Sequence, residues 1–170
     1  MIKKLVIMMS VGVAAVCAQA ETETVNGITW TYIVSDGKAS VGGGEYSSPA
    51  VSTSTSGAIT IPSILGGYPV TGISDYAFYK CDSLTSVVIP DGITRIGECA
   101  FEDCRSLVRI TVPGSVVSIG RNAFGWGTSI REVHISDIAK YIINHTFIYV
   151  MIFIYSIYNF LCSVRIINPG

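Results

Sequence analysis

The stretch that decides the fold is ITRIGECAFEDCRSLVRITVP, residues 93–113. It repeats VTGISDYAFYKCDSLTSVVIP (70–90) from 23 residues earlier, and it recurs 23 residues later as VVSIGRNAFGWGTSIREVHIS (116–136). A fixed period of this length is typical of a solenoid, in which each repeat forms one coil that stacks on its neighbours. Because solenoids mostly act through an extended surface, the repeat favours binding over catalysis.

Seven apolar positions recur at the same place in each repeat and define the expected core. The columns are Val70, Ile93 and Val116; Ile73, Ile96 and Ile119; Ala77, Ala100 and Ala123; Phe78, Phe101 and Phe124; Leu84, Leu107 and Ile130; Val87, Ile110 and Val133; Ile89, Val112 and Ile135. A single coil cannot bury such a face by itself, so about three stacked coils must share one core.

Each repeat predicts the same local elements in the same order. The Leu-x-x-Val-x-Ile segment predicts a short parallel strand with alternate side chains inward. Pro90 and Pro113 end this strand because proline cannot donate to a ladder. The Ile-x-x-Ile-Gly segment predicts a second short strand, and residues 98–102 and 121–125 predict a single helical turn. Residues 58–62 match the strand of an earlier coil, followed by a longer turn over 63–69.

The tandem motif Ile-Gly-x-x-Ala-Phe-x-x-Cys-x-Ser-Leu-x-x-Ile-x-(Ile/Val)-Pro resembles the leucine-rich repeats of the BspA-like group, over about residues 57–138. The resemblance implies a mainly β leucine-rich-repeat solenoid with short parallel strands and single helical turns. It also implies a secreted or surface-exposed protein of a kind that in some members mediates adhesion, and it supplies no catalytic residues. The departures are the small number of repeats, Gly127 in place of Cys, Ser136 in place of Pro, and the C-terminal tail.

Residues 1–20 have the pattern of a secretory signal peptide. Lys3 and Lys4 precede an apolar run from Leu5 to Ala18 that is too short to span a bilayer, and Ala18 to Ala20 give a small-x-small cleavage site. An uncleaved N-terminal anchor is the alternative. We therefore expect an exported protein at the cell surface or outside the cell.

Residues 21–56 form a β-rich, Gly/Ser-rich lead-in. A strand is expected from Ile28 to Val34, a turn at 35–37, and a hairpin partner over Lys38 to Val41. The first coil of a solenoid must cover its exposed apolar end, so this segment is expected to act as a cap. A flexible spacer is the alternative, given its composition.

The tail, residues 139–170, does not continue the repeat. Residues 141–164 contain no Asp, Glu, Lys or Arg and are long enough for a transmembrane helix. Three interpretations stay open: a membrane anchor through 141–164, a truncated gene that continues in an unrelated frame, and a strand or helix that closes the last coil.

The charge balance excludes a nucleic-acid-binding surface. The chain has 11 basic and 12 acidic residues, and loss of Lys3 and Lys4 with the leader leaves a net charge of about −3, scattered without runs. No cofactor is implied, no Cys/His cluster has metal-ligand spacing, and no serine lies in an ordered catalytic pattern. The expected partners are a protein or a glycan.

Cys81 and Cys104 lie one period apart and so occupy the same place in successive coils. Coils stack at about strand spacing, roughly 4.8 Å, which a disulfide tolerates. The pair is therefore either a ladder of buried thiols or a disulfide.

The candidate ligand face consists of the outward residues of the repeated strand. They form two columns: Ser86, Arg109 and Glu132, and Val88, Thr111 and His134. Arg109 and Glu132 lie on adjacent coils, which suits a cross-strand ion pair. The sequence thus favours a non-catalytic secreted or cell-surface binding or adhesion module. The alternative is a truncated or degenerate repeat-protein remnant without a ligand.

Overall fold

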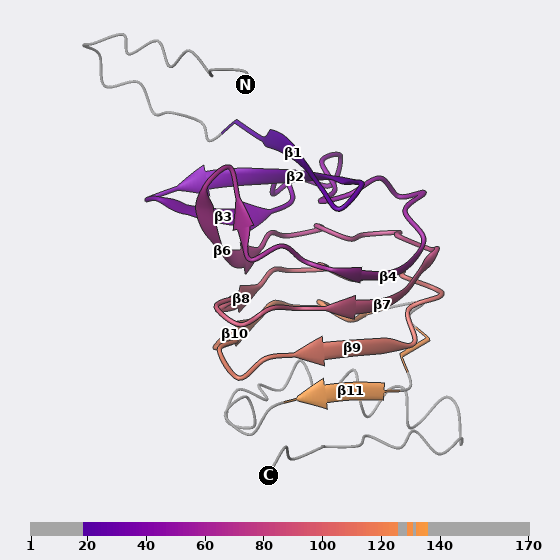
Figure 1. Cartoon of the computed structure of the whole chain (residues 1–170). Coiled ribbons are helices and arrows are strands. Elements are labelled where there is room, and N and C mark those ends of the chain that lie inside the picture. Colours follow the sequence, from indigo (N-terminus) through magenta and orange to yellow (C-terminus); the bar gives the residue numbers. More distant parts are fainter. Residues whose placement is uncertain (1–18, 126–128, 131, 136–170) are drawn as a thin grey trace, which may run out of the picture.

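The structure is a computed structural model that describes residues 19–125 and 129–130, together with the backbone of 132–135. Two β-sheets run along the stacked coils (Figure 1). Sheet A has the order β1-β2-β3-β6-β8-β10 with β5 beside β6, and sheet B has the order β11-β9-β7-β4. The strands are β1 (Glu21–Val25), β2 (Ile28–Ser35), β3 (Lys38–Val41), β4 (Gly57–Thr60), β5 (Ile64–Leu65), β6 (Tyr68–Ile73), β7 (Leu84–Val88), β8 (Arg95–Ile96), β9 (Arg109–Val112), β10 (Ser118–Ile119) and β11 (Glu132–Ile135).

The coils stack in parallel, one period apart, in both sheets. In sheet A, Gly72 pairs with Arg95 and Arg95 with Ser118. In sheet B, β7, β9 and β11 pair in the same way, and each partner is 23 residues from the last. These registers confirm the mainly β solenoid with short parallel strands that the sequence predicts.

The core consists of the predicted columns wherever the structure describes their side chains. Every such side chain is buried except that of Ile119, which is half-buried at the C-terminal end. The Phe column forms a stack: ring centroids of Phe78 and Phe101 lie 4.9 Å apart, and those of Phe101 and Phe124 5.5 Å apart. The side chains of Val133 and Ile135 lie outside the described residues.

The predicted helical turns are replaced by a chain of non-helical turns, and the described residues contain no helix. Within each coil the bonds are of the i to i−3 kind, such as Tyr79 N–H to Tyr76 C=O (3.0 Å). Alternate N–H groups donate instead to the next coil, as Phe78 does to the Ala100 oxygen (2.7 Å). Tyr76 and Cys99 have φ of 57° and 51°, and residues at positive φ interrupt a right-handed helix.

The lead-in is built into sheet A. β2 and β3 form the expected hairpin, β1 adds a further antiparallel strand, and β3 lies parallel to β6. Trp30 of β2 meets Phe78 edge-on at 6.3 Å and so covers the N-terminal end of the phenylalanine stack. The long turn over 63–69 contains a small hairpin, β5–β6, rather than an irregular bulge. The domain boundaries at 20, 56 and 138 stay a prediction.

Two glycines are required by the close approach of adjacent coils. A Cβ at Gly97 would lie 2.5 Å from the backbone nitrogen of Asp75, and one at Gly120 would lie 2.5 Å from that of Glu98. Ser74 occupies the same column in the first coil, where its hydroxyl donates to the Gly42 carbonyl oxygen (3.2 Å). A side chain fits there because the segment that precedes this coil is not a regular repeat.

Phe101→Ala is expected to destabilise the protein by about 3–5 kcal/mol, because it opens a cavity in the middle of the aromatic stack. Val117→Ala, at a side chain that is 64% exposed, should change the free energy of unfolding by less than about 0.5 kcal/mol. Chemical denaturation of both variants measures the difference. Equal stabilities would contradict a shared core through Phe101.

Gly97→Ala is expected to cost about 1–3 kcal/mol, because the added methyl group meets the backbone of the coil before it. Ser74→Ala is the matched control in the same column, since it adds no atoms and loses one hydrogen bond worth about 1 kcal/mol. Thermal and denaturant unfolding should rank Gly97→Ala as the less stable variant. The reverse order would show that the coils are not packed backbone to backbone at this column.

Candidate functional site

The outward face of sheet B arises from the alternation of side chains along its strands. In β7, Val87 is buried between the half-buried Ser86 and the exposed Val88; in β9, Ile110 is buried between the exposed Arg109 and the half-buried Thr111. The inward set belongs to the core columns. The outward set is therefore held on a rigid ladder of backbone hydrogen bonds rather than on loops.

The registers bring the predicted ligand-face residues together in two rows. Ser86 pairs with Arg109 and Arg109 with Glu132; Val88 pairs with Thr111 and Thr111 with His134. The side chains of Glu132 and His134 lie outside the described residues, so the Arg109–Glu132 ion pair stays a prediction. The described part of the face offers hydroxyl groups, one guanidinium and the 39% exposed Val88, which suits contact with a partner's surface.

Two members of this face were not predicted from the sequence. Ala58 and Thr60 of β4 are exposed and pair with Ser86 and Val88, so both rows continue onto a fourth strand. The signal was present, because Ile61 and Pro62 match the end of the repeated strand. The five extra residues between this strand and the next repeat break the 23-residue spacing and concealed the alignment.

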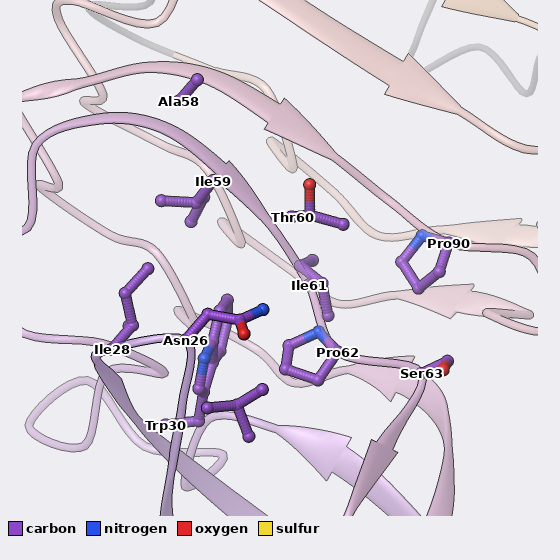
Figure 2. Close-up of a pocket in the computed structure, with 11 residues that line it drawn as sticks. Asn26, Ile28, Trp30, Ala58, Ile59, Thr60, Ile61, Pro62, Ser63 and Pro90 are labelled. Atoms are coloured by element: carbon purple, nitrogen blue, oxygen red, sulfur yellow. The ribbon is translucent and has the colours of Figure 1, made fainter.

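A groove of about 400 Å³ lies beside β4, between that strand and the turn that joins β1 to β2 (Figure 2). The buried side chain of Trp30 contributes to its wall. None of its lining residues is charged: they are Val25, Asn26, Ile28, Trp30, Ala58, Ile59, Thr60, Ile61, Pro62, Ser63 and Pro90. The groove is therefore suited to uncharged groups.

The predicted cysteine pair lies in the core. Cys81 and Cys104 are free thiols in the structure, both buried, and the Cys104 thiol donates to the Phe78 carbonyl oxygen at 2.9 Å. Burial raises the pKa of each thiol to about 12. A thiol of that pKa is protonated at neutral pH and serves neither as a nucleophile nor as a metal ligand.

An aromatic cluster lies away from sheet B, on the turn of the first coil. Tyr46 packs on Tyr79 and Tyr76 with ring centroids 4.7 and 5.9 Å apart, and the Lys80 ammonium lies 5.2 Å from the Tyr79 ring centroid. Because the three rings lie against one another, the cluster fastens the segment that carries Tyr46 onto the coil.

The described residues provide neither a metal site nor a membrane-spanning helix. No group of three His, Cys, Asp or Glu side chains among them is arranged to hold a metal ion. The described part of the chain also contains no helix that is long and apolar enough to cross a membrane. The expected anchor over 141–164 lies outside the described residues.

Comparison with known proteins identifies the repeat. Residues 58–167 match the family described as BspA type leucine rich repeat region, in six copies. The match continues beyond residue 138 into the segment that sequence analysis placed outside the repeats. No curated protein matches the chain.

Three solved structures are similar. A leucine-rich cell surface protein from Faecalibacterium prausnitzii is 30% identical, with a TM-score of 0.51 over 69% of this chain and 30% of that one. A leucine-rich repeat protein from Bacteroides capillosus is 25% identical (TM-score 0.43; 67% of this chain, 97% of that one), and one from Bacteroides ovatus is 23% identical (TM-score 0.42; 66% and 34%). This chain thus spans less than a third of the Faecalibacterium protein's length.

The buried thiols predict a slow alkylation reaction. At pH 8 a thiol of pKa about 12 is ionised in roughly one molecule in 10⁴, whereas a cysteine of the unfolded chain has a pKa of about 8.5. Iodoacetamide should therefore label Cys81 and Cys104 only after unfolding in guanidinium, as peptide mapping would show. Labelling of the folded protein at the unfolded rate, or a peptide pair joined by a Cys81–Cys104 disulfide, would contradict the free buried thiols.

Proposed function

The chain belongs to the BspA-type family of leucine-rich repeat proteins, and from this premise we propose that it is a non-catalytic binding or adhesion module that is exported to the cell surface. Its contact surface is the outward face of sheet B, with a protein or a glycan as the ligand. The cell-surface protein of Faecalibacterium prausnitzii, with the same kind of repeat, supports the location.

The observation that carries the proposal is the continuity of the outward rows across four strands. The rows run from Ala58 and Thr60 through Ser86 and Val88 to β9 and β11, in one unbroken register. Adjacent strands lie about 4.8 Å apart, so the described part of the face extends roughly 15 Å along the solenoid axis. A stretch of that length suits contact with a short epitope or a few sugar units.

The face combines groups that recognise a ligand at modest cost in conformational entropy. The hydroxyl groups of Ser86 and Thr111 both donate and accept hydrogen bonds, and Val88 offers an apolar contact. Arg109 adds a charge on a side chain that can bind a carboxylate through two hydrogen bonds. Because the residues stand on paired strands, the face is ordered before the ligand arrives.

Arg109→Ala and His134→Ala should each weaken binding by at least about tenfold, since a hydrogen bond to a charged group contributes about 1.5–3 kcal/mol. Arg121→Ala is the matched control, at an exposed arginine outside sheet B. The full-length protein and its variants are tested on a glycan array and on a panel of purified extracellular glycoproteins.

Unchanged binding in both face variants would exclude this face as the contact surface. Absence of binding to any glycan or glycoprotein would instead favour the alternative, a repeat-protein remnant without a ligand. Circular dichroism of each variant checks that the fold is retained.

A further inference from the structure

The N-terminal end of the solenoid is closed on one sheet and open on the other. In sheet A, β3 covers β6, and β2 and β1 extend the sheet beyond it. In sheet B, β4 is the last strand and pairs only with β7 among the described residues. The side of β4 that faces away from β7, here called the β4 edge, therefore presents unpaired backbone.

The hydrogen-bonding groups of the β4 edge can be assigned to residues. Gly57 donates to the Ser83 carbonyl oxygen at 3.0 Å, and Ile61 donates to that of Val88 at 3.0 Å, so the odd-numbered residues face β7. In a strand the direction of N–H and C=O alternates, which turns those of Ala58 and Thr60 to the β4 edge. Among the described residues β4 pairs with β7 alone, and no backbone hydrogen bond outside the strand ladders involves Ala58 or Thr60.

The β4 edge borders the uncharged groove. Asn26 of the β1–β2 turn and Ile28 at the start of β2 face Ile59 and Ile61 across this groove (Figure 2). Natural edge strands are commonly protected by charged side chains, by proline or by a bulge. β4 carries no charged side chain. It has a register shift between Gly57 and Ala58, and Pro62 follows the strand. Only two residues, Ala58 and Thr60, therefore direct backbone groups to the β4 edge.

We propose that the β4 edge binds one extended, uncharged peptide segment of a partner protein, which adds to sheet B as a fifth strand. Main-chain hydrogen bonds to Ala58 and Thr60 supply the pairing, and alternate apolar side chains of the peptide enter the groove against the half-buried Val25 and Ile28. This site is separate from the outward face, because it uses the backbone in the plane of the sheet.

The shape and charge of the groove favour this occupant. The β1–β2 turn stands across the groove from β4, so a single extended chain can enter where the edge of a whole second copy meets an obstruction. An uncharged lining offers no partner to a buried charge, and a charged side chain would lose its hydration without compensation. The occupant is therefore an uncharged strand rather than a basic or acidic peptide.

A fluorescent peptide, acetyl-Gly-Thr-Val-Thr-Val-Thr-Gly-amide, is the probe for the full-length protein, with binding followed by fluorescence anisotropy. Thr60→Pro removes the N–H that faces the peptide and should weaken binding at least about tenfold. Thr53→Pro is the matched control, at an exposed residue. Thr53 is the second residue of a turn that is closed by a hydrogen bond from the Thr55 N–H to the Ser52 carbonyl oxygen. Proline is favoured at the second position of such a turn.

Two methylated peptides keep the test valid even where Thr60→Pro fails to fold. One carries N-methyl groups on the valine nitrogens and the other on the threonine nitrogens, which lie on opposite edges of the strand. One of them should bind like the unmodified peptide and the other should lose binding. Equal behaviour of the two peptides, absence of binding, or undiminished binding to a peptide with lysine in place of valine would overturn the proposal.

Light scattering with size-exclusion chromatography tests the other occupant. The protein should not form a dimer that Thr60→Pro dissociates. A dimer that is lost in Thr60→Pro and kept in Thr53→Pro would assign the β4 edge to a second copy and overturn the proposal.

Discussion

The structure depends on one constraint, which is that the backbone of each coil lies directly on the backbone of the next. The Thr94 N–H donates to the Thr71 carbonyl oxygen and the Val117 N–H to that of Thr94, both at 2.8 Å and both one period apart. This spacing fixes what every column can contain. It leaves no room for a Cβ at Gly97, and it brings the rings of Phe78 and Phe101 into nearly parallel contact, with 3° between their planes. The 23-residue period in the sequence thus reflects the close stacking of the coil backbones, which restricts the residue types in each column.

The same constraint explains the left-handed residues of the turns. Tyr76, Cys99 and Asn122 have φ between 51° and 57° at equivalent places, although none of them is glycine. Such a conformation costs a residue about 1–2 kcal/mol. It turns the N–H groups along the solenoid axis, where Cys99 donates to the Arg121 oxygen at 2.9 Å. A helical turn would direct these groups into its own coil, so the bonds between coils explain why the turns are not helical.

Most of the features that recur with the 23-residue period could be predicted from the sequence, whereas several of those outside the period could not. The seven columns, the strands of sheet B and the two rows of the outward face follow from residue type and spacing alone. The turn conformation does not, because a tyrosine at position 76 gives no sign of a positive φ. β1 could have been found, since Asn26 and Gly27 are a typical hairpin turn, with φ of 52° and 78°. That the lead-in joins sheet A, and that the β4 edge stays open, depends on contacts between distant segments for which a single sequence offers no pattern.

The closed and open halves of the N-terminal end follow from where the apolar surface lies. The phenylalanine stack would expose the face of Phe78, and Trp30 covers it from β2 of sheet A. Ile59 and Ile61 are already 4% and 1% exposed with no strand beyond β4, so closing sheet B would bury little further apolar area. Backbone groups at an open edge can hydrogen-bond to solvent, so leaving Ala58 and Thr60 without a strand partner costs little stability. The N-terminal end of sheet B is therefore stable, because its apolar side chains are already buried. Its backbone donors and acceptors at the β4 edge stay available to a partner.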